Sequence, residues 1–104
     1  MNAPPFQLVY TDEARAVLMD LERPRHSVKR KKVLKTLRLL RDIGPAHPGL
    51  NSHKYHSRSG PQGEDLWESY VDDRTPGAWR IWWIWWIYGP EDDMITIVTL
   101  GPHP

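Results

Sequence analysis

Cysteine is absent from the 104 residues, so neither disulfide bonds nor thiolate metal sites can hold this fold together. Long apolar runs are absent too, since even residues 79–88 have only about half the length that a membrane-spanning helix needs. Nothing near the start of the chain has the pattern of a secretory signal peptide. We therefore expect a cytoplasmic protein. The chain length allows one hydrophobic core, so residues 1–104 are predicted to form a single domain.

Acidic residues are missing from one long stretch, although the net charge of the whole chain is only +1. From Arg23 to Arg41 there are nine cations and no acid. From Glu64 to Asp93 the balance reverses, with eight acids against two arginines. A basic surface of this density favours a polyanionic partner, either RNA or an acidic segment of another protein, over a purely solvated face.

Two amphipathic helices are predicted in the first half of the chain. The first begins at a cap residue, Thr11 or Asp12, and stops before Pro24, which cannot continue a helix. The second begins with Ser27 as its cap and ends at Gly44-Pro45. Its lysines and arginines lie opposite one apolar stripe, which comprises Val33, Leu34, Leu37, Leu40 and either Leu39 or Ile43.

Strand patterns lie on both sides of these helices. The predicted strands are residues 6–10, 53–57, 66–71, 79–88 and 94–100. Short connections after the helices favour antiparallel hairpins, with the first strand returning to the edge or the middle of the sheet. We expect an α+β domain in which two N-terminal helices pack on one face of a twisted, mainly antiparallel four- to five-stranded sheet. The opposite face is then left for a ligand or partner.

Arg80 is the one cation inside the bulky, aromatic run of residues 79–88, which is typical of a buried central strand. A guanidinium keeps its proton in proteins, so Arg80 must find an anion, an aromatic ring face or a route to solvent. Stacking on tryptophan or pairing with an acid such as Glu68 would give it a structural role. An open guanidinium would instead bind a phosphate through two hydrogen bonds.

Three short motifs follow one another along the chain: His53-Lys54-x-x-x-x-x-Gly60, Trp79-Arg80-Ile81-x-Trp83, and Ile95-x-Ile97 leading to His103. The order of these motifs along the chain, together with the element order and the lysine-rich second helix, resembles that of the RelE/ParE superfamily of bacterial toxins from type II toxin–antitoxin pairs. The resemblance covers nearly the whole chain. It implies a compact β-sheet protein with two N-terminal helices and a cognate antitoxin protein that wraps it.

Two activities are implied by this resemblance. Many members of the family cut messenger RNA in the ribosomal decoding site without a metal, whereas the ParE branch binds DNA gyrase and lacks the nuclease residues. Arg80 matches the family's phosphate-contacting arginine, and His103 matches the C-terminal histidine that some nucleases use as acid or base. The chain departs from the nucleases at residues 68–70, where many carry lysine or arginine, and at Pro104, where some have a terminal tyrosine.

Metal-free RNA cleavage needs a base for the 2′-hydroxyl proton, an acid for the departing 5′-oxygen and cations for the transition state. We expect Arg80, His103 and Glu68 to be catalytic, with Arg80 holding the scissile phosphate and His103 or Glu68 moving protons. Strand alternation, ring chemistry and helix charge indicate RNA-binding residues: Lys54, His56 and Arg58 on one strand face beside Arg80, Tyr70 on the Glu68 side, and Lys31, Lys32 and Lys35 on the basic helix.

No cofactor, metal or membrane partner is expected. His53, His56 and His47 are near one another in sequence, but no cysteine or clustered acid accompanies them at metal-ligand spacing. The favoured function is a toxin of a type II toxin–antitoxin system that cuts mRNA on the ribosome. Two alternatives stay open: a non-catalytic ParE-like toxin that inhibits DNA gyrase, and a non-toxic scaffold with the same fold.

Overall fold

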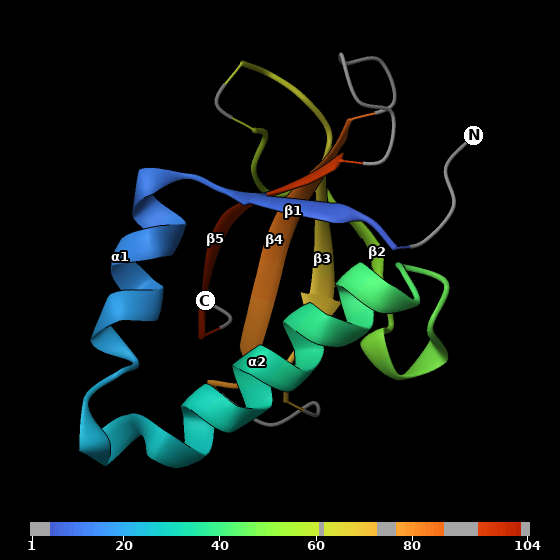
Figure 1. Cartoon of the computed structure of the whole chain (residues 1–104). Helices are drawn as coiled ribbons and strands as arrows, with labels where there is room; N and C mark the ends of the chain where they lie inside the picture. Colours follow the sequence, from blue (N-terminus) through green and yellow to red (C-terminus); the bar gives the residue numbers. More distant parts are fainter. Residues whose placement is uncertain (1–4, 61, 73–76, 87–93, 103–104) are drawn as a thin grey trace.

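The computed structural model describes residues 5–60, 62–72, 77–86 and 94–102, and for residues 82–86 it describes the backbone alone. These residues form two α-helices, two short 3₁₀ helices and a five-stranded sheet (Figure 1). The elements are, in chain order, β1 (Gln7–Tyr10), α1 (Asp12–Asp20), η1 (Pro24–His26), α2 (Ser27–Asp42), η2 (Pro48–Leu50), β2 (His53–Tyr55), β3 (Leu66–Tyr70), β4 (Trp79–Trp86) and β5 (Met94–Pro102).

The sheet has the strand order β1-β5-β4-β3-β2, which places the aromatic strand β4 in its centre (Figure 1). Strand β1 runs parallel to β5, and every other neighbouring pair is antiparallel. The prediction of a mainly antiparallel sheet with a central aromatic strand is therefore confirmed. The first strand takes the edge of the sheet, one of the two positions that the sequence left open.

A β-bulge divides the pairing of β4 with β5. Trp82 lies opposite Thr99 while the next residue, Trp83, lies opposite Ile97, so Val98 is the extra residue on β5. The bulge changes which face of the sheet the β5 side chains reach. Ile97 and Leu100 join the main core, whereas Val98 joins a smaller cluster with Leu66. The tryptophan side chains at 82, 83, 85 and 86 lie outside the described residues.

The caps of the two helices differ from each other. Thr11 caps α1 as predicted, since its Oγ1 accepts a hydrogen bond from the amide of Ala14 at 3.1 Å. Ser27, predicted as the cap of α2, is instead already helical, and His26 occupies the cap position without a side-chain hydrogen bond. The reason is the 3₁₀ turn η1, which runs straight into α2. Neither described helix is long and apolar enough to cross a membrane.

The main core joins both helices to the central strands. Buried residues of both helices belong to one cluster with Ile81 of β4 and Ile95, Ile97 and Leu100 of β5. The members from the helices are Ala14, Val33, Leu37 and Leu40, and Leu21, the C-cap of α1, joins them. One member of the predicted α2 stripe differs, because Leu34 is 39 % exposed; of the two alternatives for the last position, Leu39 packs against the core and Ile43 is 46 % exposed. The stripe that packs on the sheet is therefore narrower than the sequence pattern indicated.

Gly44 ends α2 with a φ of +95°, and a Cβ added there would lie 2.5 Å from Cε2 of Phe6. Gly63 also has a positive φ, +85°, but has open space around it. Gly63→Ala should cost only the backbone strain of about 1–2 kcal/mol. Gly44→Ala should lose a further 1–3 kcal/mol, roughly, from the collision with the ring. Urea unfolding of both variants measures the difference, and equal losses would contradict this view of the Phe6 contact.

Candidate functional site

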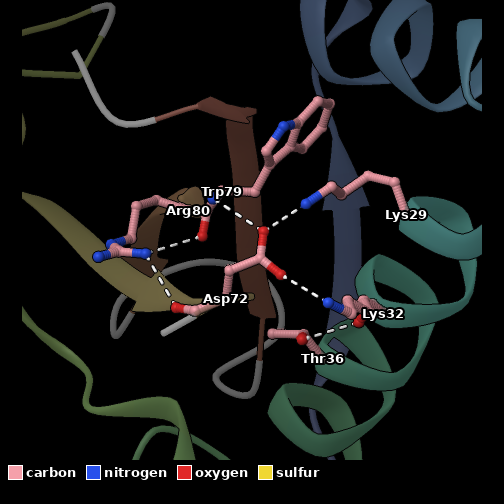
Figure 2. Close-up of polar contacts among 6 residues, drawn as sticks. All are labelled: Lys29, Lys32, Thr36, Asp72, Trp79 and Arg80. Atoms are coloured by element: carbon pink, nitrogen blue, oxygen red, sulfur yellow. Dashed lines mark hydrogen bonds and ion pairs between the residues drawn. The ribbon is translucent and has the colours of Figure 1, made fainter. Parts of the chain in front are cut away.

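Arg80 is buried, with 5 % of the residue exposed, and four groups hold its side chain, of which Figure 2 draws Asp72 and Trp79. Its Nη1 donates to the backbone carbonyls of Asp72 and Trp79, both at 3.0 Å. Its Cζ lies 3.6 Å from the ring centroid of Tyr70, and its Nε lies 3.6 Å from Oε1 of Glu68. Of the three environments that the sequence allowed, Arg80 takes the anion and the ring face, and it does not face solvent.

Glu68 connects this buried guanidinium to an accessible imidazole. Its Oε2 lies 2.7 Å from Nε2 of His53, whose other nitrogen, Nδ1, lies 2.7 Å from the carbonyl oxygen of Asn51. Both ring nitrogens of His53 therefore have an oxygen partner. The carboxylate side chain is 4 % exposed and the imidazole 43 %. The three residues form what we call the Arg80–Glu68–His53 cluster, and His53 is the member that solvent can reach.

Strand register explains why these side chains meet. His53 lies opposite Glu68 in the β2–β3 pair, and Tyr70 lies opposite Arg80 in the β3–β4 pair. Glu68 and Tyr70 are two apart on β3, so they reach the same face. The Tyr70 ring also meets the His53 ring edge to face, with centroids 5.7 Å apart. The sequence reasoning weighed His53 only as a metal ligand, and the signal that identifies it is its register with Glu68.

Lys54 lies away from the face on which it was expected. Its partner in the β2–β3 pair is Trp67, which packs against the main core, and its Nζ lies 3.2 Å from Oδ2 of Asp65. His56 and Arg58 are exposed but follow the end of β2, which stops at Tyr55 rather than at residue 57. The alternation that was to place these three cations beside Arg80 therefore does not apply. His103 lies outside the described residues.

A cleft of about 490 Å³ brings the basic helix beside the end of β3. Lys32, Lys35 and Tyr70, all predicted to bind RNA, line it together with His47 of the turn before η2. Lys31 is exposed on α2 but does not line the cleft. Among the described residues, no group of three or more histidines and acids is placed to hold a metal ion.

Asp72 lies where the cleft meets Arg80, and the sequence reasoning assigned it no role. Its carboxylate accepts from Nζ of Lys29, from Nζ of Lys32 at 3.3 Å and from the amide of Trp79 at 3.2 Å, as Figure 2 shows. Burial opposes ionisation of the carboxyl, but the hydrogen bonds from Lys29, Trp79 and Lys32 outweigh it and lower the pKa of Asp72 below its ordinary value. Asp72 is therefore an ionised link between α2 and the sheet.

Two solved structures share this fold. The structure of the YoeB dimer from Staphylococcus aureus matches with a TM-score of 0.66 at 12 % identity, over 96 % of this chain and 99 % of that one. YafQ from E. coli strain BL21(DE3) matches with a TM-score of 0.57 at 12 % identity, over 94 % and 93 % of the two chains. At 12 % identity the two likenesses show a shared fold, which is consistent with the RelE-like fold that the sequence resemblance implied. No family model and no curated protein matches the sequence.

The buried pair of Arg80 and Glu68 should behave differently from an exposed one. Arg80→Met removes the buried cation beside Glu68 and should lower the free energy of unfolding by about 3–5 kcal/mol. Adding Glu68→Leu should recover part of that loss, because the uncompensated charge is removed. Arg23→Met, in a pair with Asp20 that is 62 % and 54 % exposed, is the control and should cost less than about 1 kcal/mol. Strictly additive losses in the double variant would contradict the pairing.

The lowered pKa of Asp72 predicts how stability depends on pH. Its contribution should be complete above the ordinary value of 3.8 and should be lost as the pH falls through the lower pKa of the folded state. Denaturant unfolding of wild type and Asp72→Asn should therefore show a difference that is constant near neutrality and shrinks in acid. A difference that does not change with pH would show that the ionised carboxylate is not the source of the stability.

Proposed function

We propose that this chain is the toxin of a type II toxin–antitoxin system and acts as a metal-independent, ribosome-dependent mRNA endoribonuclease. The observation that carries the proposal is the Arg80–Glu68–His53 cluster, in which an accessible imidazole is held by a buried carboxylate. Its setting supports the proposal, since YoeB and YafQ have the same fold and are toxins. The partners are then a cognate antitoxin protein and mRNA on the ribosome.

The cluster can supply proton transfer to RNA. The His53 imidazole is exposed, and its Nδ1 can move a proton to or from RNA once it exchanges the Asn51 carbonyl for the ribose or the leaving oxygen. Glu68 orients the ring through its contact with Nε2, as a carboxylate does in other base–carboxylate pairs. His103 is our candidate for the complementary acid or base.

Arg80 is then a positioning residue. To contact a phosphate directly, its guanidinium would have to leave Tyr70, Glu68 and two carbonyl oxygens. In its observed place the guanidinium lies beside the Glu68 carboxylate that contacts His53. The phosphate charge is met instead by exposed cations, among which Lys32 and Lys35 share the cleft with Tyr70, whose ring can stack on a base. Lys31, Lys54, His56 and Arg58 are exposed and can add contacts to the RNA backbone.

One observation favours a non-catalytic toxin of the ParE kind, which would inhibit DNA gyrase. Among the described residues, the one cation in the centre of this sheet face is Arg80, which is buried and already paired with Glu68, so no guanidinium of the described part is presented there to a phosphate. In that case the cluster would hold the sheet together, and the target would be bound through a surface. For a scaffold that has kept the fold and lost toxicity, the expected result is the same: no cleavage of mRNA.

Cleavage of mRNA on programmed ribosomes separates these functions. Wild type should cut the message, and His53→Ala should lower the rate by about 10²–10⁴, the usual contribution of a general acid or base. Glu68→Gln should give a smaller loss, because the amide still accepts one hydrogen bond from the ring. Folding of each variant is checked by its unfolding curve.

His26→Ala is the matched control, since His26 contacts Asp20 and Arg25 and none of the cluster residues. It should cleave like wild type. Growth arrest by wild type with intact mRNA would contradict the nuclease and support the binding toxin. The absence of both growth arrest and cleavage would support the scaffold. Cleavage by His53→Ala at the wild-type rate would remove His53 from the mechanism.

A further inference from the structure

The Asp72 carboxylate accepts from a group of donors that an anion from outside the chain could also bind. Nζ of Lys29, Nζ of Lys32 and the amide of Trp79 converge on it from helix α2 and strand β4 (Figure 2). The carboxylate is 12 % exposed, whereas the two lysine side chains are 30 % and 55 % exposed. An external anion can therefore reach the ammonium groups from the solvent side.

These donors are also those that a phosphate group selects. Lysine acts on phosphate as a point charge, and backbone amides supply directed hydrogen bonds to its oxygens. The two lysines are three residues apart on α2, so they extend from the same side of the helix. The set therefore suits any small oxyanion of single or double charge, and Asp72 is the anion that this chain provides.

The surroundings indicate that the phosphate belongs to a nucleic acid. Asp72 and Lys32 line the cleft of about 490 Å³, whose other lining residues include Lys35 and Tyr70. Lys35 is a second lysine in the cleft, after Lys32, and Tyr70 offers a ring on which a base can stack. A phosphate at the Asp72 position would thus be followed along the cleft by groups that fit the next part of a single strand.

We propose that Lys29, Lys32 and the Trp79 amide form a binding site for an RNA phosphate, which the Asp72 carboxylate occupies when RNA is absent. Asp72 then acts as an internal competitor that RNA displaces. This inference rests on the proposed function for the identity of the ligand as RNA, but the anion site is independent of cleavage. Exchange of one anion for another keeps both lysines paired, which limits its cost in free energy.

The test is binding of a short single-stranded DNA oligonucleotide, which has the phosphodiester and bases but no 2′-hydroxyl to be cleaved. Asp72→Asn removes the competing charge and keeps an oxygen for the Trp79 amide, so its affinity should rise about tenfold over wild type, or about 1.4 kcal/mol. Adding Lys29→Gln and Lys32→Gln should reduce the affinity to the wild-type level or below. Asp42→Asn is the control. It changes the net charge of the protein by the same amount as Asp72→Asn, but Asp42 lies at the end of α2 and pairs with Arg41.

Equal affinities of Asp72→Asn and Asp42→Asn would overturn the proposal, since net charge alone would explain the gain. The proposal would also be overturned if a glutamate-rich peptide bound with the same dependence on Asp72 and the oligonucleotide did not bind. If Asp72→Asn does not fold, titration of wild type with inorganic pyrophosphate decides. The amide NMR signal of Trp79 should shift, and it should shift far less in Lys29→Gln/Lys32→Gln; equal shifts would overturn the site.

The outcome is separable from that of the nuclease proposal. If the protein binds the oligonucleotide in this way but cuts no mRNA, the phosphate-site proposal holds and the nuclease proposal fails. A chain that cuts mRNA at His53 but shows no effect of Asp72 would retain the nuclease and lose the site.

Discussion

Burial of the Arg80 guanidinium is the constraint from which the rest of this structure follows. Removing a cation from water costs several kcal/mol unless nearby groups compensate it. Here the compensating groups come from separate parts of the chain: a carboxylate and a ring from β3, and carbonyls of Asp72 and Trp79 on either side of the β3–β4 connection. A slip of one residue between β3 and β4 would move all of the β3 partners to the other face. The buried charge therefore specifies the register at the centre of the sheet.

Two connections extend from that charge to the surface. On the sheet, Glu68 pairs with both Arg80 and His53, so the position of an exposed imidazole depends on a guanidinium that solvent hardly reaches. Toward the helices, Asp72 accepts from Arg80 with its backbone and from Lys29 with its side chain. The same residue thus joins the basic face of α2 to the centre of the sheet. The exposed imidazole and the basic face of α2 are therefore connected through the same buried guanidinium.

Much of the fold could be predicted because its signals are local. The aromatic run identified the central strand, and the periodicity of the basic segment identified α2. Arg80 could be identified as well, because a single charge in an apolar run is visible without a structure, and Glu68 was among the partners considered for it. The cap of α2 was wrong because the short turn η1 leads directly into the helix.

The remaining errors concern register, which no local pattern determines. Whether His53 or Lys54 faces Arg80 depends on how β2 pairs with β3 across a long connection, and the pairing selects His53. The role of Asp72 likewise depends on a contact with Lys29, far away in sequence. Alternation along one strand gives two faces but does not say which face meets which partner.

The central claim, that the Arg80 guanidinium is held rigidly by Glu68, Tyr70 and two carbonyl oxygens, can be tested directly by nitrogen-15 NMR of the arginine side chains, with Arg80→Lys used to assign the signal. Two carbonyl acceptors on Nη1 should hinder rotation about the Nε–Cζ bond, so Arg80 should give separate, slowly exchanging Nη resonances in folded protein near neutral pH. A single averaged Nη resonance with rapid exchange, as solvent-exposed arginines give, would contradict the account.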